Sequence, residues 1–522
     1  MKKLLTLASL IVIGCVTLSV AASAGSARPA ATSLAAPTSA ATTVRVSVSS
    51  KGAQGNLPSY PEGISADGRY VVFSSGSAGL VAGDTNRRQD AFIRDRKTGR
   101  TTRISVSSSG RQGKAARDPF GGSAAEGITA DGRFVLFRSD AANLVAGDTN
   151  GFQDVFVRDR RTGRTTRISV SSSGRQANGR SEFAAISANG RYVAFDSQAS
   201  NLVSGDTNRL SDVFVRDRVK GTTQRVSVGG TGKQARCNVG SCDSWFPAIS
   251  ASGRYVAFTS GASNLVPGDT NRLPDVFVRD RALGKTRRVS LSSRGKQGTG
   301  TRYSNGSNAP AISADGRYVA FHSDPPNLVA GDTNRTFDIF VHDRTTGKTE
   351  RVSISSRGEQ ANGENLGAAS ISAGGRYVAY ASLASNLVPR DTNDITDVFI
   401  RDRRTDRTML VSLSNSGDQG SDASWPNGAP AFSAGNRYLL FASWAGNLVP
   451  GDTNGTADAF VRDLRGSLPA ERATTAASRH ESEPASSAAA TRQPEPVLWG
   501  HIRSLTRKGR RFEMRLDQQY QP

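Results

Sequence analysis

The sequence predicts an all-β protein: a seven-bladed β-propeller of four-stranded blades, closed by an N-terminal strand that completes the last blade. Three observations predict this fold. One motif recurs seven times, each copy holds four strand-like segments, and a strand missing from the last copy stands ahead of the first. Repeated sheets of this kind bury their apolar faces by radial packing, and closure of the ring removes exposed sheet edges.

The repeated motif is typified by NLVAGDTNGFQDVFVRDR, residues 143 to 160. Its first aspartate recurs at Asp84, Asp148, Asp206, Asp269, Asp332, Asp391 and Asp452. The period averages about 61 residues, which exceeds the roughly 40 to 45 residues of a common propeller blade. Each blade is therefore expected to carry long loops.

The four strands of a blade are clearest in the fourth copy. They are FPAIS (246 to 250), RYVAFTS (254 to 260), DVFVRDR (275 to 281) and RRVSLSS (287 to 293). The first two are joined by ASGR, elsewhere ADGR, which is typical of a tight hairpin turn. The continuous apolar run YVAF indicates a strand buried on both faces, whereas RVSLSS alternates like a half-exposed strand. The first two strands thus belong inside and the fourth outside.

The two ends of the array complement each other. The last copy lacks an outer strand, whereas TTVRVSVSSKG (42 to 52) precedes the first copy and matches TTRISVSSSG (101 to 110). The propeller is expected to span residues 43–466. A disordered linker rich in Ala, Ser, Glu and Pro is expected at 467–496. In the basic tail at 497–522 apolar and basic residues alternate, as they would in a truncated β-hairpin.

The N-terminus predicts export. Lys2 and Lys3, an apolar stretch and Ala22-Ser23-Ala24 form a signal peptide at 1–24, followed by a linker at 25–42. A competing interpretation reads VIGC as a lipobox with a lipid anchor at Cys15. Both place the mature chain outside the cytoplasm, secreted, periplasmic or on the cell surface. In such an oxidising compartment Cys237 and Cys242 are expected to form a local disulfide.

The net charge of +22 favours anionic partners, although arginine spread evenly over repeats also describes a solvated surface without a partner. We expect a monomer that contacts a protein or an anionic cell-envelope polymer. Nucleic acid is not expected as a partner. The absence of a dense basic run before the tail favours the solvated surface without a partner over a specific attraction of anions.

ISADGRYVAF followed by DIFVHDRTTGKTERVS, between residues 312 and 353, resembles the TolB-like propeller repeat. The resemblance spans about residues 43 to 466 and implies the propeller fold. Alanine replaces the proline usual in the family's turn, and the NLVxGDTN loop is an addition. The partnership of the family's namesake with the Tol-Pal system is therefore not transferred.

The acidic loop raises a metal hypothesis. Oxygen side chains stand at relative positions 1, 3 and 7 of each copy, a spacing compatible with calcium. In the first three copies these residues are Asp84, Asn86, Asp90, Asp148, Asn150, Asp154, Asp206, Asn208 and Asp212. The alternative, which we favour, is that these side chains hydrogen-bond the loop backbone as Asx turns do. No cofactor other than calcium is indicated.

The long loops point to a binding face. The NLVAGDTN loop and the inter-blade segment emerge on one face of the propeller, and the two short turns emerge on the other. The inter-blade segments vary between copies and carry aromatic residues that could stack on sugars or hold a peptide, or that pack as lids. These candidates are Tyr60, Phe120, Phe183, Trp245, Phe246, Tyr303 and Trp425.

No catalytic constellation emerges from the sequence. There is no Gly-x-Ser-x-Gly elbow, and none of the four histidines stands in a triad or metal motif. A non-catalytic binding or scaffold propeller is therefore favoured. The alternative is an extracytoplasmic hydrolase or lyase that acts on a glycan through the propeller channel.

Overall fold

The computed structural model describes residues 41–114, 121–236, 242–300, 304–425, 432–465, 467–468, 502–508 and 511–516. The predictions for the signal peptide, Cys15, Phe120, Cys237 and Tyr303 fall outside these residues. Within them, the only helical element is the short 3-10 helix η1 (Ala78–Leu80), and no helix is long and apolar enough to span a membrane.

Seven four-stranded antiparallel sheets form the ring, and in each blade the strands follow one another from the innermost to the outermost. Blade 1 holds β2 (Ser59–Ile64), β3 (Tyr70–Ser75), β4 (Asp90–Asp95) and β5 (Arg100–Arg103). Blade 2 holds β6 (Ser123–Ile128), β7 (Phe134–Ser139), β8 (Asp154–Asp159) and β9 (Arg164–Arg167). Blade 3 holds β10 (Ser181–Ile186), β11 (Tyr192–Ser197), β12 (Asp212–Asp217) and β13 (Thr222–Arg225). Blade 4 holds β14 (Ser244–Ile249), β15 (Tyr255–Ser260), β16 (Asp275–Asp280) and β17 (Lys285–Arg288). Blade 5 holds β18 (Ser307–Ile312), β19 (Tyr318–Ser323), β20 (Asp338–Asp343) and β21 (Thr349–Arg351). Blade 6 holds β22 (Asn365–Ile371), β23 (Tyr377–Ser382), β24 (Asp397–Asp402) and β25 (Arg407–Leu410). Blade 7 holds β26 (Ser424–Trp425), β27 (Tyr438–Ser443), β28 (Asp458–Asp463) and β1 (Thr42–Arg45).

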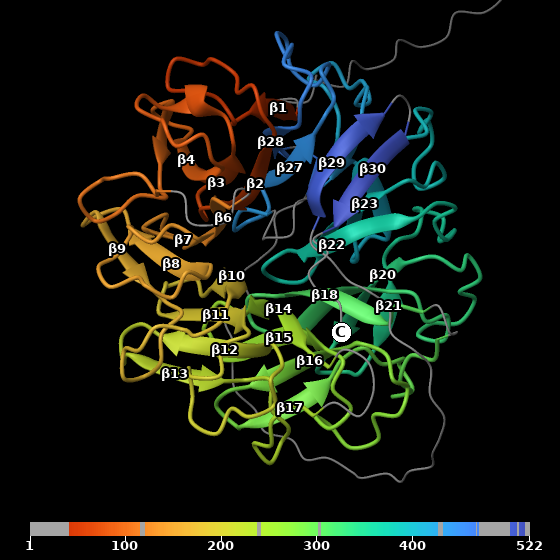
Figure 1. Cartoon of the computed structure of the whole chain (residues 1–522). Helices are drawn as coiled ribbons and strands as arrows, with labels where there is room; N and C mark the ends of the chain where they lie inside the picture. The colour runs from red at the N-terminus through yellow and green to blue at the C-terminus, as the bar shows by residue number, and fades with distance from the viewer. Residues whose placement is uncertain are drawn as a thin grey trace, which may run out of the picture. The chain divides into compact units, whose positions relative to one another are not determined.

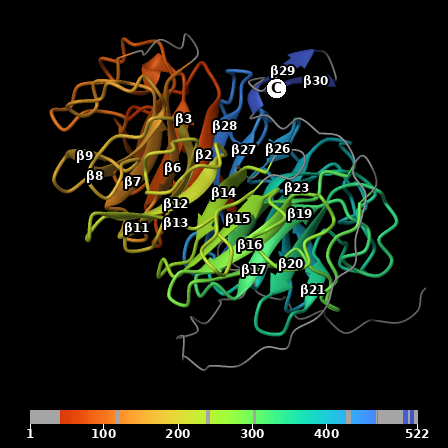
Figure 2. The same ribbon diagram turned by 60° about the horizontal axis from the view of Figure 1, so that its bottom comes forward.

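The innermost strands of neighbouring blades contact one another around the ring, from β2 through β6, β10, β14 and β18 to β22. Figure 1 shows these strands around the centre, and the tilted view in Figure 2 shows β9, β17 and β21 toward the rim. The predicted seven-bladed propeller is confirmed.

The N-terminal strand closes the ring, as predicted. β1 pairs antiparallel with β28, so that Thr42 lies opposite Asp463 and Arg45 opposite Phe460. Val46 follows β1 and is buried in a core cluster that joins the first and last blades. Closure therefore combines backbone hydrogen bonds with an apolar contact.

The outer strands are shorter than the sequence predicts. β17 ends at Arg288, whereas the pattern indicated a strand over 287 to 293. One more ladder bond joins Val289 N to Val276 O, after which the chain turns and Leu291 bridges Gln297. The alternation in RVSLSS thus belongs partly to a turn whose serines are hydrogen-bonded rather than to a long strand.

The core lies between the blades. Val72 and Ile93 of blade 1 pack with Val135 and Phe137 of blade 2, and equivalent clusters fill the other junctions. Both faces of each second strand are covered because it contacts two neighbouring blades. This packing explains why YVAF is continuously apolar.

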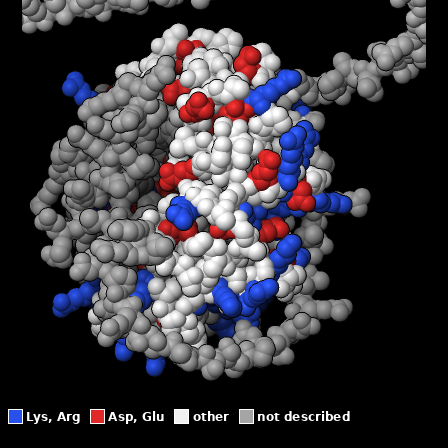
Figure 3. Space-filling view, turned by 90° about the vertical axis from the view of Figure 1, so that its right-hand side faces the viewer, with Lys and Arg blue, Asp and Glu red and all other residues white. Residues whose placement is uncertain are grey.

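Arginine stacks seal the junctions on the face of the short turns. Tyr70 lies between the guanidinium of Arg69, 4.7 Å from its ring centroid, and that of Arg160 from the next blade, at 3.9 Å. Equivalent cross-blade stacks join six of the seven junctions, and in the seventh Leu464 packs near Tyr377 instead. Much of the basic charge is therefore part of the architecture. On the side seen in Figure 3, acidic and basic residues are both present among the described atoms.

The tight turn before the second strand needs a special backbone. Gly68 has φ 73°, and a Cβ atom there would lie 2.1 Å from the Tyr438 ring. Asn436 takes the same place in blade 7 with φ 59°. Glycine and asparagine adopt this left-handed conformation most readily, which accounts for the ADGR signature.

The C-terminal segment contains a separate pair of strands. β29 (Ile502–Lys508) pairs antiparallel with β30 (Arg511–Leu516).

Candidate functional site

The acidic loops are held by an arginine of the outer strand. In blade 1 Arg103 Nη1 lies 3.0 Å from Asp84 Oδ1 and 3.2 Å from Asp90 Oδ2. The other oxygen of Asp90 accepts a 2.5 Å hydrogen bond from Ser105 Oγ. One guanidinium thus neutralises part of a buried carboxylate pair, which would otherwise be costly to bury.

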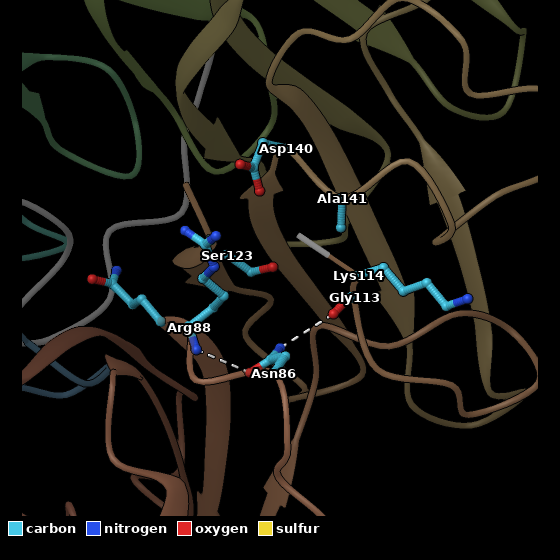
Figure 4. Close-up of a pocket in the computed structure, with 9 residues that line it drawn as sticks. Asn86, Arg88, Gly113, Lys114, Ser123, Asp140 and Ala141 are labelled. Atoms are coloured by element: carbon cyan, nitrogen blue, oxygen red, sulfur yellow. Dashed lines mark hydrogen bonds between the residues drawn. The ribbon is translucent and has the colours of Figure 1, made fainter. Parts of the chain in front are cut away.

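Asn86 completes the loop as an Asx turn. Its Nδ2 donates to Gly113 O at 3.2 Å, and its Oδ1 accepts from Arg88 N at 3.1 Å (Figure 4). The same Nδ2 also donates to Asp90 Oδ2 at 3.2 Å. The next two blades repeat this pattern with Asn150 and Asn208. The asparagine therefore ties its loop to the following inter-blade segment.

The calcium hypothesis gains no support from this geometry. The arginine lies against the same carboxylates that the ion would need, and no group of three His, Cys, Asp or Glu side chains in the described part of the chain could hold a metal.

The sequence interpretation missed the arginine, although its signal was present. An Arg-x-Ser pattern recurs in six outer strands, at Arg45, Arg103, Arg167, Arg225, Arg288 and Arg351.

Blade 6 is the exception, because Leu410 stands where the other outer strands have arginine. Asp397 accepts hydrogen bonds from Asn393 Nδ2 at 2.8 Å and from Ser412 Oγ, and Asp391 accepts one from Gln419 Nε2 at 3.1 Å. Burial raises the pKa of Asp397 to about 6. This blade keeps the loop without a cation at its centre.

Two hollows lie elsewhere on the blades. The one in Figure 4 has a volume of about 10 Å³, room for a single water, and is lined by Asn86, Arg88 and Asp140 among others. A groove of about 400 Å³ is lined by Ile93, Asp95 and Arg160 among others. Ile93, Asp95 and Arg160 belong to the framework common to the blades, whereas the positions of Arg88 and Asp140 vary between copies.

The aromatic candidates lie on the innermost strands rather than in the inter-blade loops where the sequence placed them. Tyr60 lies on β2, Phe183 on β10, Trp245 and Phe246 on β14, and Trp425 on β26, and all five are half-buried. The strands begin two residues earlier than the pattern indicated, which brings these rings into the inner wall.

These rings form two groups. Tyr60 and Trp425 lie 6.4 Å apart between ring centroids, where blades 1 and 7 meet. Phe183 contacts Phe246 at 4.4 Å, edge to face, and Trp245 lies 6.5 Å from Phe246, where blades 3 and 4 meet. Phe246 has φ 53°, a conformation that is costly for a non-glycine residue and often found at functional sites.

The blades also differ along the inner wall. In six blades a serine pair fixes the start of the first strand against the end of the second, as in the 2.9 Å bond from Ser59 to Ser75, and in blade 6 Asn365 stands opposite Ser382. The residues beside this pair vary in size, charge and polarity, and we call them the variable inner positions. On the first strands they are Tyr60, Ala124, Glu182, Trp245, Asn308, Leu366 and Trp425, and on the second strands Ser74, Arg138, Asp196, Thr259, His322, Ala381 and Ala442.

Four carboxyl groups gather at or near these positions in blades 1 to 3, and we call Glu62, Glu126, Glu182 and Asp196 the acidic cluster. Arg138 Nη1 lies 2.6 Å from Glu126 Oε1, and Ala184 N donates to Glu126 Oε2 at 3.2 Å. The Arg138 guanidinium lies 5.5 Å from the Phe183 ring centroid. Arg180 forms an ion pair with Glu182. The cluster thus joins two blades and meets the aromatic group of blades 3 and 4.

Burial disfavours the charged forms of these carboxyls. It raises the pKa of Glu126 to about 7, although Arg138 opposes the shift. Burial and the neighbouring charge of Glu126 raise the pKa of Glu62 well above its ordinary value. Burial, Glu182 and Glu126 do the same for Asp196. Several carboxyls with raised pKa values in one place are a feature of functional sites.

The histidines do not assemble a catalytic group within the described residues. His322 stacks on Phe337 at 4.2 Å, and His342 Nδ1 is 2.8 Å from Thr349 Oγ1. Burial lowers the pKa of each histidine to about 4. His480 and His501 lie outside the described residues.

Cys242 is buried and disulfide-bonded. Its predicted partner Cys237 lies outside the described residues, so the pairing stays a prediction.

No protein-family model and no curated protein matches the chain. Among solved structures, an oligogalacturonate lyase from Vibrio parahaemolyticus is 10% identical, with 79% of this chain and 91% of that chain covered and a TM-score of 0.45. An oligogalacturonate lyase in complex with manganese is 12% identical, covers 82% and 97%, and has a TM-score of 0.47. TolB from Acinetobacter baumannii is 14% identical, covers 76% and 81%, and has a TM-score of 0.33.

At such identities the likeness concerns the fold alone. The chain is a seven-bladed β-propeller, and the TolB-like repeat remains a resemblance of its sequence.

Proposed function

We propose that the chain is an exported, non-catalytic binding propeller, and that it holds a partner protein at the variable inner positions of blades 1 to 4 and at the adjoining rings of Phe183 and Phe246. The observation that carries this proposal is the contrast between a constant framework and a varied inner wall. A framework must repeat in every blade, whereas a single binding site needs differences between blades. The half-buried rings of Phe183, Trp245 and Phe246 supply rigid contact area of the kind that dominates binding energy.

The test starts from capture of envelope proteins and isolated cell-wall polymers by the purified chain, over increasing salt. The captured partner is then titrated against a Phe183→Ala/Trp245→Ala variant and against Phe152→Ala, which removes a ring that is 44% exposed on the acidic loop of blade 2. We expect at least about a tenfold loss for the double variant and no change for the control. Equal affinity of both variants, with folding verified by circular dichroism, contradicts the proposal.

A glycan hydrolase or lyase is the second candidate function. The observation that favours it is the pKa of Glu126, raised by burial to about 7, since a general acid needs a carboxyl that stays protonated near neutral pH. Release of reducing or unsaturated ends from isolated envelope glycans, abolished by Glu126→Gln, would establish this activity.

A further inference from the structure

The acidic cluster contains more carboxyls than arginines, whereas the molecule as a whole contains more basic than acidic residues. The chain has 67 Lys and Arg but 45 Asp and Glu, yet at the inner ends of blades 1 to 3 four carboxyls face two arginines, Arg138 and Arg180. Glu182 is its accessible member, with a side chain that is 28% exposed. The cluster therefore offers a cationic ligand more carboxyl oxygens than its two arginines occupy, and the positive charge of that ligand would favour the ionised forms of the carboxyls.

An independent observation comes from polar atoms without partners. Asp196 is 4% exposed, and its Oδ1 accepts no hydrogen bond. At the same repeat position of the next two blades, Thr259 Oγ1 and His322 Nδ1 also lack partners. By contrast, Ser74 in blade 1 accepts a 2.9 Å bond from Ala125 N. Buried polar atoms without partners cost free energy, so a ligand that supplies hydrogen-bond donors would stabilise this wall.

The chemistry of the wall selects an organic cation rather than a bare ion. Among the described residues no three suitable side chains lie close enough to hold a metal. The rings of Phe183 and Phe246 offer faces to a cationic group, and Arg138 already lies over Phe183 at 5.5 Å. A guanidinium carries five N–H donors and pairs with carboxylates and aromatic faces together.

We propose that the ligand of this site is an arginine-containing basic segment of the partner protein, with a guanidinium held by Glu182 and Asp196 beside Phe183. This inference rests on the proposed function and adds the class of ligand. Because the molecule as a whole is strongly basic, non-specific attraction favours acidic peptides. Binding of a basic peptide therefore has to come from a local site.

The experiment measures binding of fluorescently labelled hexa-arginine to the full chain by anisotropy, with hexa-citrulline and hexa-glutamate as peptides of matched length. Glu182→Gln and Asp196→Asn each replace a carboxyl by an amide of nearly the same shape. Asp406→Asn is the matched control, since Asp406 is 79% exposed in the short turn between β24 and β25. We expect each cluster variant to bind hexa-arginine at least about tenfold more weakly than the wild type, and the control to bind within about twofold.

Failure to bind hexa-arginine, or equal binding by the cluster variants and the control, overturns the inference. Unfolding is separated from loss of binding by the melting temperature of each variant. The captured partner distinguishes the two proposals. If it needs Phe183 and Trp245 but binds Glu182→Gln and Asp196→Asn like the wild type, the binding function stands and the cationic ligand is wrong.

Discussion

Blade 6 lacks the arginine that the outer strands of the other six blades carry. This difference shows how the framework handles buried charge. In blade 5 Arg351 lies 3.2 Å from Asp332 and 3.1 Å from Asp338, whereas blade 6 has Leu410 at the equivalent place. Serine and asparagine hydrogen bonds hold the acidic loop of blade 6 without the ion pair. The arginine therefore adds stability to a loop that the side-chain hydrogen bonds already shape.

Leu410→Arg is expected to stabilise the fold, because the guanidinium can reach both Asp391 and Asp397. We expect a gain in the free energy of unfolding of about 1 to 2 kcal/mol at pH 8. At pH 5 the gain should shrink, since burial raises the pKa of Asp397 to about 6 and its protonated form does not attract the cation. Denaturant unfolding at both pH values measures the difference.

The matched control is Arg351→Leu, which creates the blade 6 arrangement in blade 5 and should lower stability. A Leu410→Arg variant no more stable than the wild type at pH 8 would show that the leucine contact with the neighbouring core compensates fully for the missing ion pair.

At the scale of residues, the sequence predicted some contacts of the site and missed others. The Asx role of Asn86 was expected because its partners are near in sequence. The ion pair of Asp84 with Arg103 and the approach of Arg138 to Phe183 were not, because they join different strands or blades. Repeat alignment gives each residue its place in a blade, whereas pairs between blades need the packed ring.

At the scale of elements, the order and type of the strands followed from the repeat, while their ends did not. β15 and β16 lie within one residue of the expected bounds. β14 begins two residues early, and this shift moves Trp245 from a predicted loop into the inner wall. The variable sequence at the start of each first strand hides its β pattern, because residues of differing size, charge and polarity replace the β-branched ones there.

The closing strand offers a direct test at this scale. Val46 beyond β1 and Val226 beyond β13 hold equivalent positions and are both buried, at 1% and 0% exposure. Only Val226 belongs to a blade that is continuous in sequence. If closure is as firm as an ordinary outer strand, Val46→Ala and Val226→Ala should each cost about 2 kcal/mol of unfolding free energy.

Denaturant unfolding of the two variants decides the point. A cost for Val46→Ala near zero, beside a normal cost for Val226→Ala, would mean that the N-terminal strand frays from blade 7 and that the ring closes weakly.

At the scale of the whole molecule, the charge of +22 acquires a structural meaning. Composition alone left open whether the arginines attract an anionic partner. In the structure many of them pair with loop carboxylates or stack on rings between blades. The sequence predicted the ring and its closure, because these follow from repetition. It did not predict the acidic cluster, whose members come from three blades.

The buried carboxyls of the acidic loops contribute to the pH dependence of the fold. Burial raises the pKa of Asp148 and Asp332 to about 6 and that of Asp269 to about 7. The folded chain therefore keeps protons that the unfolded chain releases near pH 4. Between about pH 4 and 7 the fold binds more protons than the unfolded state, so its stability falls as the pH rises through this window.

Other carboxyls act in the opposite direction at lower pH. Burial opposes ionisation of Asp217 and Asp343, but hydrogen bonds from Arg191 and Arg317 outweigh it and hold both pKa values at about 2. Their contribution is present above the unfolded pKa near 4 and is lost as the pH falls toward 2. We thus expect the highest melting temperature at about pH 4 to 5, with a decline toward pH 8. Thermal scans from pH 3 to 8 at constant ionic strength measure it, and a maximum at neutral pH would mean that the arginines compensate the loop carboxylates fully.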